Sequence, residues 1–167
     1  MKQLDHYSNS FKKRRFPITL IGENVTNAPN VGSLFRTADA FGVEKLILCG
    51  NHIPLGRKMT KTSRSTEKVV DYEISTNSHE TISSYKNQGY QIIALEITET
   101  SKPLNTYQFS NKHPIALIIG DENFGVSEGV LNLCNDIVHV EMYGQNSSMN
   151  VVHATSVTLY EITKQFL

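Results

Sequence analysis

Ala116-Leu-Ile-Ile-Gly120-Asp-Glu122-Asn-Phe-Gly125 decides the fold, because it runs from an apolar strand straight into a glycine turn. The unbroken apolar run of residues 114–119 is typical of a strand buried on both faces of a parallel sheet. Residues 126–134 follow with the pattern of a short helix. Gly120 would let a ligand approach the backbone closely. Glu122 is therefore placed to contact a substrate or to hold a loop, although an ordinary strand-to-helix turn would look the same.

Strand and helix patterns alternate along the rest of the chain as well. We predict further strands over residues 16–23, 45–49, 69–74, 91–97 and 136–140, and further helices over residues 30–41, 78–87 and 148–166. This alternation predicts an α/β fold in which helices flank a mostly parallel sheet. The 167 residues have the size of one domain, with residues 1–16 as a short basic N-terminal extension. The polar stretch 51–67 is longer than the usual loop between two elements, so we expect it to have a function or a structure of its own.

The net charge is zero, but the charges are unevenly distributed. Residues 1–68 hold 12 Lys/Arg against 5 Asp/Glu, and residues 69–167 hold 4 against 11. This asymmetry indicates a basic face for a polyanion, or two halves that neutralise each other across the fold or a dimer contact. The candidate RNA-binding cations are Lys12, Lys13, Arg14, Arg15, Arg57, Lys58, Lys61 and Arg64. The first four could equally be a solvated basic N-terminus.

Cysteine and histidine spacings indicate no metal site. Cys49 and Cys134 lie in apolar surroundings, which favours buried thiols in a reducing compartment. His153 lies in the apolar last helix and is expected in the core or an interface. No apolar run has the length of a membrane span, and the first residues lack the apolar core of a signal peptide. We therefore expect a cytoplasmic protein with no membrane partner.

A first polar motif, Asn27-Ala-Pro-Asn30-Val-Gly-Ser-Leu-Phe-Arg36, opens the predicted helix 30–41. Asn30 could cap this helix, and backbone N–H groups near Gly32 could hold a phosphate. Arg36 lies opposite the apolar stripe and would be able to reach such a phosphate. The alternative is a capped surface helix with a solvated arginine.

The chain ends with a glycine loop and its longest helix. Val140-Glu-Met-Tyr-Gly144-Gln-Asn-Ser-Ser148-Met-Asn150 leads from a strand into the helix 148–166, which Ser147 or Ser148 could cap. That helix is apolar on nearly all sides, so it must be covered on nearly all sides. A second subunit is the natural cover, which predicts a homodimer through the C-terminal helix. A central helix within one chain is the alternative.

Together the three motifs resemble those of the SpoU (TrmH-like) tRNA/rRNA ribose 2′-O-methyltransferase family of the SPOUT superfamily, over residues 18–161. The resemblance implies a C-terminal deep trefoil knot, an obligate dimer, and S-adenosylmethionine as methyl donor with S-adenosylhomocysteine as product. Two departures are visible. Pro29 directly precedes Asn30, and Val140-Glu141-Met142 stands where the family often has Ile-Pro-Met, which puts the shape of the donor loop in question.

The resemblance also implies roles for individual residues. The matching catalytic positions are Asn30, Arg36, Glu122, Ser148 and Asn150. The matching donor-binding positions are Leu95, Gly120, Val140, Ser148 and Met149. The family points to Arg36 as a general base, but a guanidinium is normally always protonated, so orienting the substrate and stabilising negative charge is the safer role.

The implied reaction is transfer of a methyl group to a ribose 2′-OH, with tRNA favoured over rRNA as substrate and DNA excluded. One alternative is a catalytically inactive RNA-binding protein with the same fold. A generic nucleotide-binding domain is a weaker alternative, because the Gly-x-Gly-x-x-Gly fingerprint is absent.

Overall fold

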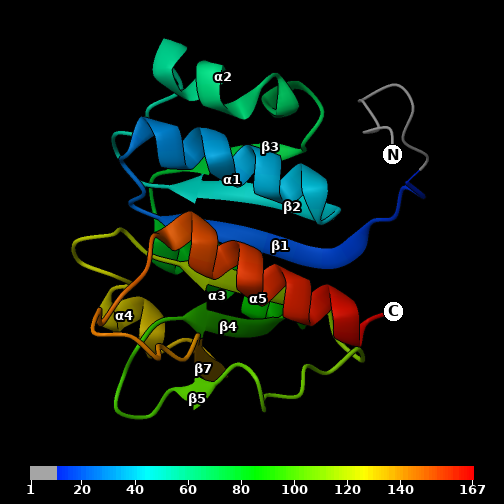
Figure 1. Ribbon diagram of the computed structural model, residues 1–167, viewed down its shortest axis with the longest axis vertical. Helices are drawn as coiled ribbons and strands as arrows, with labels where there is room; N and C mark the ends of the chain where they lie inside the picture. Colours follow the sequence, from blue (N-terminus) through cyan, green and yellow to red (C-terminus); the bar gives the residue numbers. More distant parts are fainter. Residues whose placement is uncertain (1–10) are drawn as a thin grey trace.

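A seven-stranded parallel sheet organises the computed structural model, which describes residues 11–167 (Figure 1). The strand order is β3-β2-β1-β6-β4-β7-β5, and every neighbouring pair is parallel. The strands are β1 (Phe16–Glu23), β2 (Val43–Cys49), β3 (Tyr72–Ser75), β4 (Gln91–Leu95), β5 (Lys102–Pro103), β6 (Ile115–Ile119) and β7 (Asp136–His139). The predicted α/β class with a parallel sheet is confirmed. The first ten residues of the predicted extension lie outside the described residues.

Helices cover both faces of the sheet (Figure 1). The helices are α1 (Ala28–Ala40), α2 (Arg57–Ser63), α3 (Ser78–Asn87), α4 (Glu128–Leu131) and α5 (Val151–Gln165), with a 3₁₀ turn at Thr66–Lys68. Apolar residues of α1, α2 and α5 pack in one core and those of α3 and α4 in the other. All five residues of β6 are buried, since the strand lies between the two cores.

Several predicted boundaries are wrong, and the reason lies in local hydrogen bonds. Asn30 does not cap α1: the cap is Asn27, whose side chain accepts from the Asn30 N–H at 3.1 Å. Likewise α5 is capped by Asn150 and not by Ser147 or Ser148. The strand predicted over residues 69–74 begins at Tyr72, because the N–H groups of Val69 and Val70 bond back to the Thr66 carbonyl of the 3₁₀ turn. The short edge strand β5 was not predicted.

The long polar stretch is structured because α2 packs directly on α1. A Cβ at Gly32 would lie 2.4 Å from the Met59 carbonyl oxygen, so only glycine allows this approach. Gly32 therefore serves helix packing. The Asn30 N–H is bonded to the Asn27 side chain, so this donor is not free for a phosphate, and the phosphate site at the start of α1 stays a prediction.

Helix α5 buries several threonines beside core residues Val152, Leu159 and Ile162, and leaves two apolar side chains exposed. Thr155, Thr158 and Thr163 are buried, and each hydroxyl donates to the carbonyl four residues earlier. Val157 is 44% and Tyr160 is 60% exposed. His153 is exposed too, so of its two predicted places, the core and an interface, only the interface stays a prediction. No helix among residues 11–167 has the length and hydropathy needed to cross a bilayer.

Both cysteines are free thiols. Cys49 is buried as predicted, whereas Cys134 is only half-buried, with its Sγ 3.3 Å from the Val130 carbonyl oxygen. Desolvation raises the pKa of each thiol to about 11. Neither thiol therefore carries the charge that a nucleophile or metal ligand needs at neutral pH.

Candidate active site

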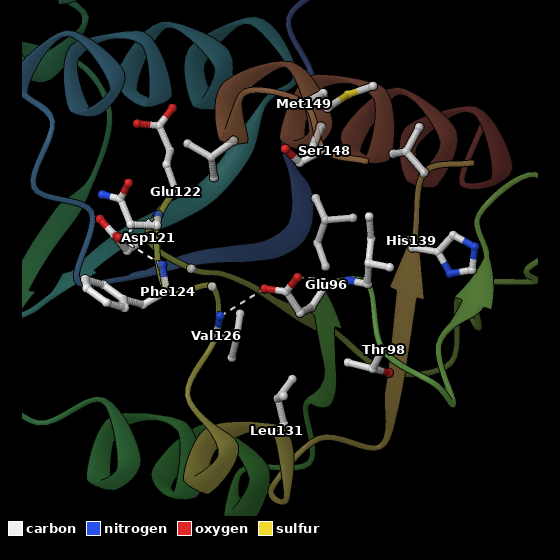
Figure 2. A pocket seen from close by; sticks show the side chains of 18 of the residues that line it. Glu96, Thr98, Asp121, Glu122, Phe124, Val126, Leu131, His139, Ser148 and Met149 are labelled. Carbon is white, nitrogen blue, oxygen red and sulfur yellow. Dashed lines mark hydrogen bonds between the residues drawn. The ribbon is translucent and has the colours of Figure 1, made fainter. Parts of the chain in front are cut away.

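A cavity of about 480 Å³ lies at the carboxyl ends of β4, β6 and β7, beside the start of α5 (Figure 2). All five predicted donor-binding positions line it: Leu95, Gly120, Val140, Ser148 and Met149. Glu122 lines it as well. Residues that are far apart in the sequence meet here because parallel strands end at the same edge of the sheet.

The loop after β6 is folded tightly back on itself. The Asp121 carboxylate accepts from the N–H groups of Asn123 (2.8 Å) and Phe124 (3.3 Å), and the Gly125 N–H donates to the Asp121 carbonyl at 2.8 Å. Gly125 has φ +66°, a conformation that favours glycine. A Cβ at Gly120 would lie 2.1 Å from the Gly125 carbonyl carbon. The two glycines therefore give this wall of the cavity its shape.

Two carboxylates, from β1 and β4 on either side of β6, hold the end of this loop. Glu96, just after β4, accepts from the Val126 N–H at 3.0 Å. Glu23, at the end of β1 and only 3% exposed, accepts from the N–H (2.8 Å) and hydroxyl (2.9 Å) of Ser127 and from the Ser78 hydroxyl (2.7 Å). Sequence reasoning missed both residues. The available signal was an acidic side chain at the end of an apolar strand.

The side chain of Asn150 joins the three sequence motifs. Its amide nitrogen donates to the Asn30 side-chain oxygen at 3.2 Å and to the Glu122 carboxylate at 2.7 Å. Its oxygen accepts from the Val152 N–H at 2.9 Å and so caps α5. One side chain therefore fixes the start of the last helix and also ties α1 to the loop after β6.

The loop after β7 is anchored by the residue that replaces the expected proline. Glu141 accepts from the Asn105 side-chain amide and from the Tyr143 hydroxyl, the latter at 3.0 Å. The hydrogen bond to Glu141 raises the pKa of the Tyr143 hydroxyl. Side-chain hydrogen bonds thus tie down a loop that lacks the rigid ring of proline.

The sequence profile of the SpoU rRNA Methylase family matches residues 17–160. The chain belongs to this family. It is 28% identical over 164 residues to a tRNA (guanosine(18)-2′-O)-methyltransferase of Aquifex aeolicus, covering 98% of this chain and 77% of that relative. It is also 30% identical over 154 residues to a 23S rRNA (guanosine-2′-O-)-methyltransferase of Shewanella oneidensis, covering 92% of this chain and 61% of the relative.

One solved structure agrees with this assignment to the SpoU family, and a second shares the fold. The Aquifex aeolicus TrmH/SpoU tRNA modifying enzyme has a TM-score of 0.81 at 28% identity, covering 92% of this chain and 77% of the enzyme. An AdoMet-bound rRNA methyltransferase from Sinorhizobium meliloti has a TM-score of 0.84 at 21% identity, covering 94% of this chain and 59% of that one. The second likeness concerns the fold alone.

Not all of the SpoU motif residues meet at the cavity. Asn30, Glu122 and Asn150 are hydrogen-bonded together, and Ser148 lines the cavity. Arg36 is exposed on α1 and is not among the lining residues. Its guanidinium makes no hydrogen bond or ion pair within residues 11–167, so it is available to a ligand that comes from outside.

The predicted RNA-binding cations divide between two surfaces. Arg57, Lys58, Lys61 and Arg64 are exposed on α2 and at its end, while Met59 and Ser63 of this helix are buried. Lys12, Lys13 and Arg15 are exposed beside a hollow of about 920 Å³ that is also lined by the end of α1 and the start of β2. Arg14 differs, because it donates to the Phe166 carbonyl at 3.1 Å and lies over the Phe16 ring. It therefore helps to hold the end of α5.

Proposed function

We propose that the protein is an S-adenosylmethionine-dependent RNA methyltransferase that methylates a ribose 2′-OH. The observation that carries this proposal is the Asn150 side chain, which joins Asn30 to Glu122 beside a cavity lined by every predicted donor-binding position. Relatives in the SpoU family are named as tRNA or rRNA guanosine 2′-O-methyltransferases. The solved relative from Sinorhizobium meliloti is described as bound to AdoMet.

The cavity fits the donor in size and in chemistry. Its volume of about 480 Å³ is within the range of small-molecule sites. Thr98 lines it, and its buried hydroxyl oxygen has no hydrogen-bond partner within residues 11–167. The donor would be held by the five lining residues predicted to bind it, Leu95, Gly120, Val140, Ser148 and Met149. When bound, the donor supplies a methyl group on a positively charged sulfur.

The remaining motif residues act on the RNA. The Asn150 amide holds the Glu122 carboxylate in one orientation, so that its second oxygen can accept a hydrogen bond from substrate. Arg36 binds the phosphate beside the target nucleotide and stabilises the negative charge that develops on the attacking oxygen. Correct placement of the reacting groups can by itself supply roughly 7–11 kcal/mol of the barrier reduction.

A transfer assay with labelled donor tests the activity. A tRNA transcript should accept label on ribose, 23S rRNA fragments should accept less, and DNA of the same sequence should accept none, because DNA lacks the 2′-OH. Mapping of ribose methylation in cells that lack the protein would identify the nucleotide. If the protein binds RNA but neither binds the donor in calorimetry nor transfers label, the inactive RNA-binding alternative holds instead.

We also infer a homodimer formed through α5. The exposed Val157 and Tyr160 are the support, because one chain alone leaves these apolar side chains in water. Light scattering should give twice the chain mass of 18.7 kDa. Tyr160→Glu should shift the protein toward the monomer, whereas the same change at the exposed Lys112 should not.

We further infer that the C-terminal segment forms the deep trefoil knot of SPOUT proteins. Support comes from the strand order, in which β4 lies between β6 and β7 and the chain then crosses to α5 on α1. An experimental density map traced from β4 to α5 would decide this.

The free thiols agree with a cytoplasmic location, where disulfides are rare.

A further inference from the structure

We propose that Glu96 makes the cavity selective for the positively charged methyl donor over its uncharged thioether product. This inference rests on the proposed function, because it assumes that the cavity binds S-adenosylmethionine. Glu96 is not one of the positions that the family motifs assign to the donor. Its place in the cavity, its fixed carboxylate and the charge of its surroundings carry the argument.

Glu96 is one of the residues that line the cavity. It follows the last residue of β4, and Figure 2 shows its side chain extending across the cavity toward the loop after β6. One carboxylate oxygen accepts from the Ile97 N–H at 2.9 Å and the other from the Val126 N–H at 3.0 Å. Each oxygen keeps one further acceptor site. The carboxylate is thus held in place without being saturated.

Three carboxylates and one histidine, His139, are the ionisable side chains of the lining. Glu96, Asp121 and Glu122 line the cavity, and no lysine or arginine of the described chain does. The three ion pairs within residues 11–167 involve other carboxylates, those of Glu73, Asp136 and Glu161. The Asp121 carboxylate accepts from N–H groups of its own loop, and the Glu122 carboxylate accepts from the Asn150 side-chain amide. Glu96 differs from the exposed Glu122 because it is half-buried and both of its oxygens are held by backbone N–H groups. Its charge therefore acts on a bound cation from a fixed position and with less screening by solvent.

The donor and its product differ by one methyl group and one positive charge. The ammonium and carboxylate of the methionine part are common to both, so their interactions cancel in a comparison. A cavity of about 480 Å³ is on the order of 10 Å across, so a sulfonium anywhere in it lies within about one Debye length of Glu96. Attraction to a partly buried charge at such a distance favours the donor and weakens retention of the product.

Calorimetric titration of the protein with each ligand tests this. In Glu96→Gln the dissociation constant of S-adenosylmethionine should rise about tenfold, equivalent to about 1.4 kcal/mol, and that of S-adenosylhomocysteine by less than about twofold. Glu96→Asp keeps the charge but shortens the reach to Val126, so both ligands should weaken together and their ratio should stay. Glu73→Gln removes an equal charge from β3, outside the cavity, and should leave both constants unchanged.

Three other results would overturn the proposal. Equal weakening of both ligands in Glu96→Gln would mean that the residue only holds the loop. No change in either constant would mean that the carboxylate does not act on the ligand. If the preference for S-adenosylmethionine over S-adenosylhomocysteine also disappeared in Glu96→Asp, which keeps the charge, charge would be excluded as the cause. If the unaltered protein binds neither ligand while its unfolding temperature is normal, the proposed function itself fails, which is a separate outcome.

Discussion

The side-chain amide of Asn150 donates to the Glu122 carboxylate across 2.7 Å, although the two residues belong to different motifs. The same side chain caps α5 through the Val152 N–H. The orientation of Glu122, which we propose is needed for catalysis, and the stability of α5 therefore depend on opposite ends of one amide group. Substitutions can separate the two effects.

Asn150→Ser and Asn150→Ala separate the contact with Glu122 from the capping of α5. Serine can still cap the helix but is too short to reach Glu122, so it should lose methyl transfer by about 100-fold or more while remaining near normal stability. Alanine should lose the same activity and in addition about 1 kcal/mol of unfolding free energy. Chemical denaturation and the transfer assay together measure both effects. Normal activity in the serine variant would contradict the role of the Asn150–Glu122 hydrogen bond.

Arg36→Ala should abolish methyl transfer while the dissociation constant of the donor stays within about twofold. The reason is that Arg36 is exposed and does not line the cavity. The free energy of unfolding of the Arg36→Ala protein should change by less than about 0.5 kcal/mol, as for an ordinary surface site. Arg36→Lys should recover little activity, because an ammonium lacks the planar fork of a guanidinium. The exposed Lys112→Ala is the control, and an active Arg36→Ala enzyme would refute the catalytic role.

Gly32→Ala should destabilise the protein by about 1–3 kcal/mol and weaken RNA binding together. The added methyl would lie 2.4 Å from the Met59 carbonyl oxygen, so α2 and its cations must shift. Gly129→Ala in α4 is the matched control, because a Cβ there meets no atom within 4 Å. Thermal unfolding and filter binding measure the two effects. Undiminished stability in Gly32→Ala would mean that α2 is not tightly held.

RNA affinity should fall with salt, and loss of single cations on α2 should change the slope. Lys58→Ala or Lys61→Ala should each reduce the slope of log K against log salt concentration by about one. Arg14→Ala should instead lower stability, because Arg14 donates to the Phe166 carbonyl. Fluorescence anisotropy from low to moderate salt measures the slopes. Slopes that match the unaltered protein would exclude α2 from the RNA interface.

Both cysteine thiols should resist alkylation in the folded protein. Burial raises their pKa values to about 11, so at pH 8 the thiolate fraction is roughly 100-fold below that of an unperturbed thiol. The sign of the effect means that reactivity should increase steeply as pH rises toward 11, and also on unfolding. Mass spectrometry after brief iodoacetamide treatment checks this. Rapid labelling of Cys49 at pH 8 would show that the residue is accessible.

The resemblance to the SpoU motifs predicted the residues that line the cavity better than the local pattern predicted the helix ends. Gly120, Val140 and Met149, which match the family's donor-binding positions, line the cavity. The caps were misplaced by a few residues, since several neighbouring asparagines and serines satisfy the same preference and only backbone geometry selects one. The catalytic assignments remain predictions for the assays above.

Local pattern alone therefore determined the alternating strands and helices, the parallel sheet and the three polar motifs, because periodicity and turn chemistry depend on near neighbours in the chain. Only the tertiary structure decided that Glu96 and Glu23 hold consecutive backbone groups of one loop, and that Gly32 admits α2 onto α1. These contacts join residues from separate parts of the chain. Their distances arise from how the sheet and helices pack, which no local sequence pattern encodes.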